Sequence, residues 1–193
     1  MKRLMMTAMA AVMLAAVPAL AAEKGFYIAG NGGLTMPTDV DEGNTVSTYD
    51  PGFNGAGAVG YDLGDFRIEA EYAYHRVGTD EVFLGATRID VPGSLEVISY
   101  MVNGHYDFEV PNSPLMPSVG LGIGGVESQL EIRSGPLAGK QRDSEFGFQL
   151  MLGMGVEMSK HLAFTVGYKF LSTAELDDEA MLHDINLGFR YLF

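Results

Sequence analysis

The end of the chain alternates between apolar and polar side chains with a period of two, and this pattern constrains the fold more than any other feature. From Ile185 onward a large apolar residue occupies every second position, and the chain ends on Phe193. Successive side chains of a β-strand point to opposite faces. One face of this strand is therefore apolar and aromatic. Its residues are Ile185, Leu187, Phe189, Tyr191 and Phe193; Asp184, Asn186, Gly188 and Arg190 lie between them, and Leu192 is the one apolar exception.

This terminal strand, within the segment from Met181 to Phe193, resembles the C-terminal strand signature of bacterial outer-membrane β-barrels. The resemblance implies that its aromatic residues, Phe189, Tyr191 and Phe193, form the signal that the barrel-assembly machinery recognises. It also implies that the apolar face of the strand contacts lipid.

The first residues have the pattern of a secretory signal peptide. Lys2 and Arg3 precede an apolar run, and Ala19-Leu20-Ala21 supplies small residues for a cleavage site. We place cleavage after Ala21, with Ala22 as the alternative, so that residues 1–21 form the signal peptide and residues 22–193 form the barrel domain. The apolar run is too short for a membrane anchor, and no stop-transfer charges follow it. The pattern predicts that the protein is exported.

Export makes the composition of the mature chain informative. The chain of 193 residues contains no cysteine, so a regular hydrogen-bonded framework must replace the disulfides of many small secreted domains. Removal of Lys2 and Arg3 leaves 10 basic and 25 acidic residues, a formal charge of −15. This acidity argues against nucleic-acid partners, which require basic surfaces. No later segment approaches the roughly 20 apolar residues of a membrane helix, so a mature chain that enters a membrane must cross it as strands.

The clearest internal strand begins at Phe66. Arg67, Glu69 and Glu71 share one face of it, and aromatic residues stand at both ends of the other face. This arrangement is typical of a membrane barrel strand, in which aromatic residues lie near the two interfaces and charged residues line the lumen. A helix is excluded, because at 3.6 residues per turn the same positions scatter around the axis.

The same alternation recurs along the chain and predicts eight strands, joined by alternating long loops and short turns. Long extracellular loops and short periplasmic turns are typical of outer-membrane barrels. We therefore predict an all-β fold: an eight-stranded antiparallel transmembrane β-barrel, connected as an up-and-down meander. The predicted strands are 25–34, 52–61, 66–75, 95–108, a strand from Pro117, 145–158, 162–171 and 181–193; the long loops are 35–51, 77–94, 128–143 and 172–180.

Taken in order, several stretches resemble the small OmpA-type barrels and the related bacterial surface-antigen barrels of the porin-like superfamily of Gram-negative bacteria. The resemblance covers nearly the whole mature chain. It implies a barrel surrounded by outer-membrane lipid and lipopolysaccharide, with extracellular loops available to a ligand. The even number of strands leaves both termini in the periplasm, and we expect a monomer or a weakly associated barrel. The stretches are GFYIAGNGGL, FRIEAEYAYH, MVNGHYDF, PSVGLGIG, FQLMLGMGV, VGYKF and INLGFRYLF.

Two motifs could suggest a bound cofactor or a metal site, but their sequence context supports neither. Gly120, Gly122 and Gly125 match a dinucleotide-binding motif, but such a motif must open a helix, and the next residues continue to alternate as a strand. His105 and Asp107 share the inward face of one strand. Without further ligands at zinc-like spacing, we interpret them as a hydrogen-bonded pair. We expect no cofactor and no metal.

Eight charged residues are predicted to face the lumen. An eight-stranded barrel is only wide enough for side chains to fill it, and buried charges must be paired or hydrated. We therefore expect a network of ion pairs that closes the lumen, with a narrow or gated pore as the alternative. The residues are Arg67, Glu69, Glu71, Asp107, Glu157, Lys169, Asp184 and Arg190.

The expected function is that of an integral surface protein of the outer membrane, with a structural, adhesion or host-contact role carried by its loops. The alternative is a small porin-like channel for ions or small solutes. A lipid-modifying barrel enzyme comes third. Such an enzyme needs Ser and His within hydrogen-bond reach at the bilayer rim, and nothing in the sequence marks such a pair. We expect no enzyme. Loops determine specificity, and this sequence does not identify the ligand.

Overall fold

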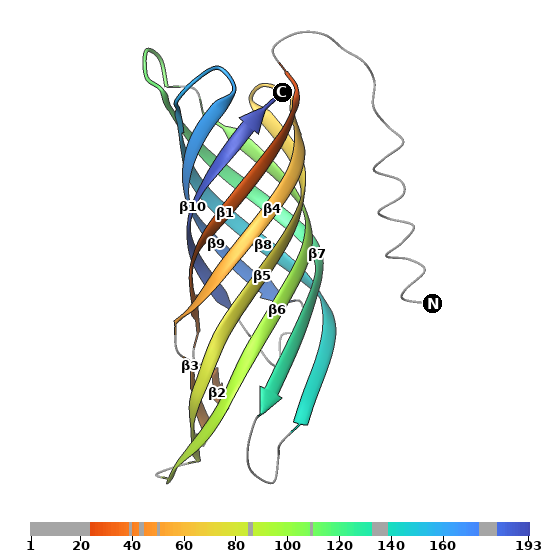
Figure 1. Ribbon diagram of the computed structural model, residues 1–193, viewed down its shortest axis with the longest axis vertical. Helices are drawn as coiled ribbons and strands as arrows, with labels where there is room; N and C mark the ends of the chain where they lie inside the picture. The colour runs from red at the N-terminus through yellow and green to blue at the C-terminus, as the bar shows by residue number, and fades with distance from the viewer. Residues whose placement is uncertain are drawn as a thin grey trace, which may run out of the picture.

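The chain forms a tall closed barrel of tilted antiparallel strands (Figure 1). The computed structural model describes residues 24–38, 40–42, 45–49, 51–84, 87–108, 110–132, 139–173 and 181–193. Within these residues there is no helix long and apolar enough to cross a membrane. The barrel strands are β1 (Phe26–Pro37), β4 (Gly52–Asp62), β5 (Phe66–Leu84), β6 (Thr87–Asp107), β7 (Leu115–Ile132), β8 (Gly139–Glu157), β9 (Leu162–Thr173) and β10 (Leu182–Leu192); a short hairpin of β2 (Val40–Glu42) and β3 (Thr45–Tyr49) pairs with β5.

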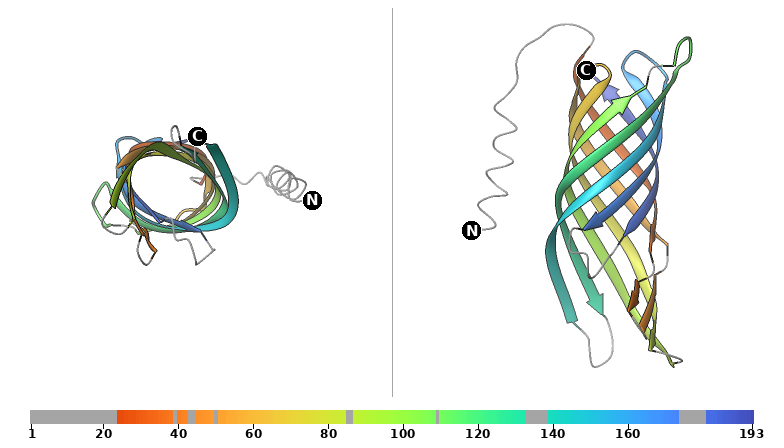
Figure 2. Two further views of the ribbon diagram at one scale, coloured as in Figure 1. Left: turned by 90° about the horizontal axis from the view of Figure 1, so that it is seen from below. Right: turned by 180° about the vertical axis from the view of Figure 1, so that it is seen from behind.

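Each barrel strand pairs with its neighbours, and β1 closes the ring by pairing with β10 from Tyr27–Leu192 to Pro37–Leu182. The view along the barrel shows the closed ring (Figure 2). The eight-stranded antiparallel meander predicted from the sequence is therefore confirmed. Leaving aside the added hairpin, every pairing joins consecutive barrel strands except the β1–β10 seam.

The two faces of the wall differ as the alternation predicts. On β10 the outward residues Leu187 and Phe189 are 55% and 54% exposed, whereas inward Asp184 is 1% exposed. Outward aromatic residues on neighbouring strands contact each other edge to face, as in Tyr72–Tyr100 and Phe164–Phe189. An apolar outer surface with a polar interior is the arrangement of a barrel immersed in lipid.

The long connections are shorter than the sequence suggested. Strands β5 and β6 run through most of the predicted loop 77–94, and β7 and β8 extend into the predicted loop 128–143. The predicted loop 35–51 contains the end of β1 and the hairpin β2–β3. The loop boundaries were wrong because strand pairing uses backbone groups, so a hairpin can continue without an apolar face.

The opposite end of the barrel has short turns, and both ends of the described chain lie there (Figure 1). The Phe193 backbone N–H donates to the Phe26 carbonyl over 3.0 Å, and the Asp62 N–H donates to the Gly25 carbonyl over 2.8 Å. Gly64 has a φ of 104° in the β4–β5 turn, a conformation that side chains rarely adopt. We call this the turn end, and the opposite end the loop end.

Candidate functional site in the barrel lumen

At the turn end, one carboxylate holds two guanidinium groups together. Arg67 on β5 donates through Nε and Nη2 to Asp107 on β6 over 2.5 and 2.9 Å, and Arg190 on β10 donates to the same carboxylate over 3.3 Å. Both guanidinium groups also lie over the ring of Tyr27, at 5.6 and 5.9 Å from its centroid. Bidentate pairing of this kind fixes geometry as well as charge. We call these four residues the clamp.

Glu69 forms the next layer toward the loop end, and polar side chains of β1 and β6 satisfy it. The Tyr27 hydroxyl donates to Glu69 Oε2 over 2.6 Å, and Asn103 Nδ2 donates to Glu69 Oε1 over 3.0 Å. His105 Nε2 lies 3.1 Å from the same oxygen. The carboxylate therefore has a hydrogen-bond partner on each oxygen, as a buried charge requires.

Glu71 is paired directly with a cation. Lys169 Nζ on β9 lies 2.5 Å from Glu71 Oε1, and Gln149 on β8 donates to the same oxygen over 3.2 Å. Gln149 also donates to Asn103 Oδ1 over 2.7 Å, which connects this layer with the one around Glu69. Side chains from four strands are thus joined across the lumen.

Asp184 is satisfied without a lysine or arginine. The Thr35 hydroxyl donates to Asp184 Oδ1 over 2.6 Å, and His75 Nε2 lies 2.9 Å from Oδ2. Asn54 in turn donates to the Thr35 hydroxyl over 3.1 Å. These four side chains come from β1, β4, β5 and β10, and they close the lumen on the side opposite β7.

Nearer the loop end, apolar side chains gather in the lumen among the buried serines Ser94, Ser99 and Ser172. Val97, Met101, Val126, Leu171 and Leu182 form one buried cluster, with Leu95 packed against it. A hydrophobic constriction excludes water from a pore. We call this cluster the apolar plug; the sequence analysis did not identify it.

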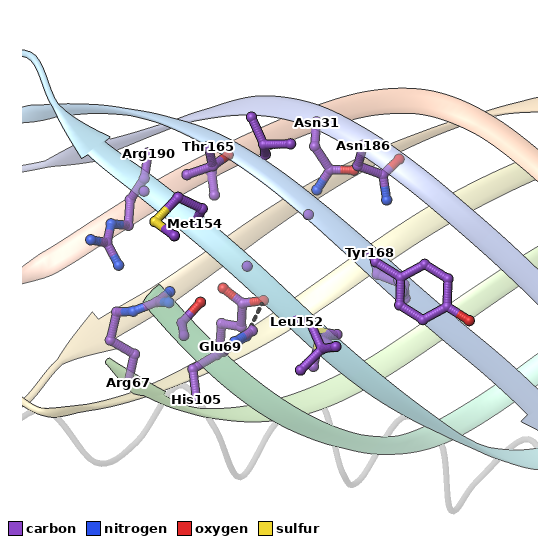
Figure 3. A pocket seen from close by; sticks show the side chains of 18 of the residues that line it. Asn31, Arg67, Glu69, His105, Leu152, Met154, Thr165, Tyr168, Asn186 and Arg190 are labelled. Carbon is purple, nitrogen blue, oxygen red and sulfur yellow. Dashed lines mark hydrogen bonds and ion pairs between the residues drawn. The ribbon is translucent and has the colours of Figure 1, made fainter. Parts of the chain in front are cut away.

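A small cavity of about 130 Å³ remains beside the polar layers (Figure 3). Its lining includes Asn31, Thr165 and Asn186 on one side and Arg67, Glu69 and His105 on the other. The carbonyl oxygens of Asn31 and Asn186 are buried without a partner among the described residues. Water bound in this cavity would have polar partners in these two amide oxygens.

Inward glycines make room for these side chains. A Cβ placed on Gly120 would lie 2.6 Å from His105 Nδ1, and one placed on Gly122 would collide with the Asn103 side chain. A Cβ on Gly60 would similarly overlap the Tyr27 ring. The crowding expected of a narrow lumen is therefore present on β7, where the sequence places Gly120, Gly122 and Gly124.

Seven of the eight charged residues expected in the lumen lie there, and six of them, all but Asp184, belong to the clamp or to the layers around Glu69 and Glu71. Glu157 does not join them: it is the last residue of β8, is exposed at the rim, and makes no ion pair among the described residues. The side chain was expected on the inward face, but β8 ends at this residue, so the barrel wall does not bury it. The expected pairing of His105 with Asp107 was also wrong. His105 contacts Glu69, and the Asp107 carboxylate is paired with Arg67 and Arg190.

The sequence pattern did not reveal the polar side chains that contact these charged residues. Their common signal is position: each occupies an inward site on a strand next to one that carries a charge. Polar residues at such sites are expected to complete the hydrogen bonds of their neighbours. These residues are Tyr27, Thr35, Asn54, His75, Asn103 and Gln149.

The lumen geometry does not resemble a hydrolytic site. Asp184 lies between Thr35 and His75, so the imidazole cannot take the hydroxyl proton as it does in a catalytic triad. At the turn after β8, the Ser159 hydroxyl accepts backbone N–H groups of His161 and Leu162, while His161 Nδ1 lies 3.0 Å from the Leu192 carbonyl. The glycines 120, 122 and 125 lie inside β7 and open no helix. Among the described residues there is no cluster of three metal-binding side chains.

The aromatic residues of the last strand lie on the outside of the barrel. Phe189, Tyr191 and Phe193 are exposed, and the Tyr191 and Phe193 rings contact each other at 5.3 Å between centroids. They occupy the turn end of β10, next to the seam with β1.

Comparison with known proteins agrees with this geometry. The chain is 25% identical over 209 residues to opacity protein opA50 of Neisseria gonorrhoeae, which covers 81% of this chain and 88% of that protein. The crystal structure of Neisserial surface protein A has a TM-score of 0.65 at 15% identity, covering 88% of this chain and 97% of that one. Ail, the attachment invasion locus protein of Yersinia pestis, in complex with the heparin analogue sucrose octasulfate, has a TM-score of 0.54 at 16% identity, covering 89% and 100%. The two structures share the barrel fold. The family model of the outer membrane protein β-barrel domain matches residues 7–193, and the chain belongs to this family of the bacterial outer membrane.

Proposed function

We propose that this protein is a closed surface barrel of the outer membrane whose loop end projects into the extracellular space and carries an adhesion or host-contact surface. The turn end and both termini then lie in the periplasm. One observation carries the proposal: β5, β6, β7 and β8 span 18–21 residues each, whereas β1, β4, β9 and β10 span 11 or 12. A membrane strand needs only about 9–11 residues, so the four long strands extend beyond the bilayer as a sheet.

A row of side chains on this sheet is consistent with a membrane boundary at one level along the strands. Outward Tyr72 and Tyr100 pair across β5 and β6, and aromatic residues are typical of the interface. Four residues further along the same face, Arg76 pairs with Glu96, and Gln129 accepts a hydrogen bond from Arg142 over 3.0 Å. Charged side chains on the outward face belong in water rather than in hydrocarbon. The aromatic row therefore marks the outer interface.

The closed lumen favours this role over a channel. Ions entering from the turn end would meet the clamp, then two polar layers, and then the apolar plug. Passage requires displacing buried ion pairs and opening a dry constriction. In the described lumen, the Thr35 hydroxyl and His75 both contact Asp184 and do not form a nucleophile–base pair, which does not favour a lipid-modifying enzyme.

The ligand of this surface differs in charge from that of the Ail complex. A heparin analogue is a polyanion, and the mature chain expected here has a formal charge of −15. An acidic surface repels such a ligand and attracts basic groups. We therefore propose a proteinaceous partner with basic side chains rather than a sulfated glycan.

The orientation is tested by labelling intact cells. Because the chain contains no cysteine, an introduced cysteine is the one thiol of the protein that the label can modify. A Ser144→Cys variant on the projecting part of β8 should react with a membrane-impermeant maleimide on whole cells. An Asp65→Cys variant in the β4–β5 turn should react only after the outer membrane is opened. Labelling of Asp65→Cys, and not of Ser144→Cys, on intact cells would reverse the proposed orientation.

The closed lumen is tested by planar-bilayer conductance of the refolded protein. The wild type should show no sustained conductance, because the clamp, the polar layers and the apolar plug lie in series. Clear single-channel steps in the wild type would make the porin-like alternative the better one.

The assembly role of the last strand remains part of the proposal. Deletion of Phe193, or its replacement by Ser, should sharply lower the amount of heat-modifiable protein in the outer membrane. The matched control is Phe146→Ser, which removes a phenylalanine of β8 that is 56% exposed, against 68% for Phe193. Equal losses in the two variants would assign the effect to lost apolar surface and not to a recognition signal.

A further inference from the structure

Three of the six asparagines of the chain are followed directly by glycine, and all three lie within barrel strands. They are Asn31 on β1, Asn54 on β4 and Asn103 on β6. Each asparagine side chain faces the lumen, where it lines the cavity or takes part in a polar layer. Because side chains alternate along a strand, the glycine that follows lies on the outward face. The same dipeptide thus occurs at the same kind of position in three strands.

The fold does not require glycine at these outward positions. A Cβ on Gly104 would meet no atom within 4 Å, and Cβ atoms on Gly32 and Gly55 would lie at ordinary contact distances of 3.5 and 3.9 Å from the nearest backbone oxygen. None of the three has a positive φ, which among the described glycines occurs only at Gly64. Glycine lowers the stability of a strand interior. Its other effect falls on the asparagine that precedes it.

An asparagine followed by glycine can lose its side-chain amide without an enzyme. The backbone nitrogen of the glycine attacks Cγ of the asparagine, so that an N–Cγ bond forms, the Cγ–Nδ2 bond breaks, and Nδ2 leaves as ammonia with the proton of the attacking N–H. Water then opens the resulting succinimide ring at one of its two carbonyl groups and leaves either aspartate or isoaspartate. Glycine favours the first step because it has no Cβ and adopts many backbone conformations. The reaction therefore needs a flexible chain and water.

The closed barrel denies both to Asn103. Its side chain is 0% exposed; Nδ2 donates to Glu69 Oε1 over 3.0 Å, and Oδ1 accepts from Gln149 over 2.7 Å. Strand β6 pairs on both sides at Gly104, with β5 and with β7. The backbone N–H of Gly104 therefore points within the sheet toward a neighbouring strand and not toward the inward side chain of Asn103.

Asn54 is held in a similar way. It is 7% exposed, and Nδ2 donates to the Thr35 hydroxyl over 3.1 Å. The following residue, Gly55, pairs with Gly32 on β1 and with Tyr74 on β5. Closure of the barrel therefore protects both asparagines, whereas an unfolded chain leaves them open to attack.

We propose that Asn54 and Asn103 are sites of spontaneous deamidation in the unfolded chain, and that a chain modified at either site no longer closes into the barrel. At position 103, aspartate would remove the donor to Glu69 and place a second buried carboxylate beside it, and like charges at this distance repel strongly. At position 54, aspartate would remove the donor to the Thr35 hydroxyl, which itself donates to Asp184. Isoaspartate adds one carbon to the main chain and so breaks the register of the strand on both sides.

Asn31 differs from the other two, and this difference supplies a control. Its Oδ1 has no partner among the described residues, and the side chain lines the cavity (Figure 3). Three bases and two acids line the same cavity: Arg67, Lys169, Arg190, Glu69 and Glu71. A carboxylate at position 31 therefore has cations nearby, so Asn31→Asp should refold in detergent, whereas Asn103→Asp should yield at least tenfold less folded barrel. Equal yields of the two variants would overturn the proposal.

A second experiment measures how long the unfolded chain keeps its ability to fold. The full chain is held in guanidinium chloride at mildly alkaline pH, portions are transferred to detergent at intervals, and folded protein is measured as the heat-modifiable band on a gel. The wild type should lose refolding with time. Gly55→Ala/Gly104→Ala should lose it at least fivefold more slowly, because an alanine Cβ hinders the attack on the preceding asparagine.

The matched control is Gly57→Ala/Gly125→Ala, which replaces two glycines that have open space and follow no asparagine. It should lose refolding at the rate of the wild type. Equal rates in all three proteins would overturn the proposal, as would an equal slowing by the two double variants. The proposal concerns the chain before it folds, so these results do not depend on the orientation of the barrel in the membrane.

Peptide mass spectrometry assigns the loss to particular residues. In the unfolded wild type, the peptides that contain residues 54 and 103 should deamidate at the rate at which refolding is lost, and chains that still fold should be unmodified at both. In the folded barrel, kept in detergent at the same pH, the two sites should deamidate at least tenfold more slowly. Deamidated residue 103 in the folded fraction, or equal rates in folded and unfolded protein, would overturn the proposal.

Discussion

The lumen is filled in two different ways, and the difference between them shows what each kind of filling does. From the clamp to Asp184 it holds charged and amide side chains whose hydrogen bonds require one particular register of the strands. Toward the loop end, the apolar plug packs hydrocarbon and one thioether beside buried His75 and Ser99. Apolar groups of suitable size can repack, whereas a buried charge without its partner is strongly destabilising. We infer that the polar layers specify the register and that the plug keeps water from them.

The strongest test of this comparison is to break the clamp. Asp107→Ala leaves Arg67 and Arg190 without their shared carboxylate, and the free energy of unfolding should fall by about 3–5 kcal/mol, as for other buried pairs that lose one partner. The measurement is urea unfolding of the refolded barrel in detergent. Removing Arg190 as well should restore part of the loss, because one buried charge is then no longer unpaired. A single variant as stable as the wild type would show that the clamp is hydrated.

The second test removes volume from the plug. Leu171→Ala should lower the free energy of unfolding by about 2–5 kcal/mol, because it opens a cavity among Val97, Met101 and Val126. Leu171→Met keeps the volume and should lose less than about 1.5 kcal/mol. If the two substitutions had equal effects, the plug would not be closely packed.

A third test contrasts the two faces of the wall at glycine positions. Gly122→Ala places a methyl group against Asn103 and should destabilise the barrel by about 1–3 kcal/mol. Gly57→Ala on the outward face meets nothing within 4 Å and should stabilise it by about 0.5–1 kcal/mol, since alanine loses less backbone entropy than glycine. Unfolding curves of the two variants would contradict this contrast if both were destabilised alike.

The smallest effect is expected outside the membrane. Arg76 and Glu96 lie 3.9 Å apart at side-chain exposures of 42% and 30%, so Glu96→Gln should change the free energy of unfolding by only about 0–1 kcal/mol. The effect should shrink further in concentrated salt. A loss as large as that of Asp107→Ala would mean that this pair is buried by a contact absent from the isolated chain.

The sequence predicted the direction of side chains well because a period of two is a local property. The inward positions of Arg67, Glu69, Glu71 and Lys169 follow from alternation alone. Their partners do not, because strands tilt around the barrel and the hydrogen-bonded layers join residues far apart in the chain. His75 meets Asp184 across 109 positions, and no local pattern relates them. The length of the strands at the loop end could not be predicted from the sequence either, since polar hairpins and polar loops have the same composition.

The plug was missed for a related reason. Leu171 and Leu182 lie at the ends of predicted strands beside an acidic loop. At such a position the sequence does not indicate whether a single leucine is buried in the lumen. Only the closed barrel brings them together with Val97 and Met101 on β6, across the ring from β10. Topology, rather than hydrophobicity, makes these residues a core.

The seam between β1 and β10 has a consequence for the order of folding. Thr35 and Asp184 meet across it although 149 positions separate them in sequence, which makes this the most non-local hydrogen bond between side chains in the described part of the chain. Contacts of such long range form late, because the entropy of closing so large a loop must be lost before they contribute. Until then, β1 and β10 each present an unpaired edge to other chains, which is a risk for aggregation. The unclosed barrel is therefore the state in which this protein most needs protection by other proteins of the cell envelope.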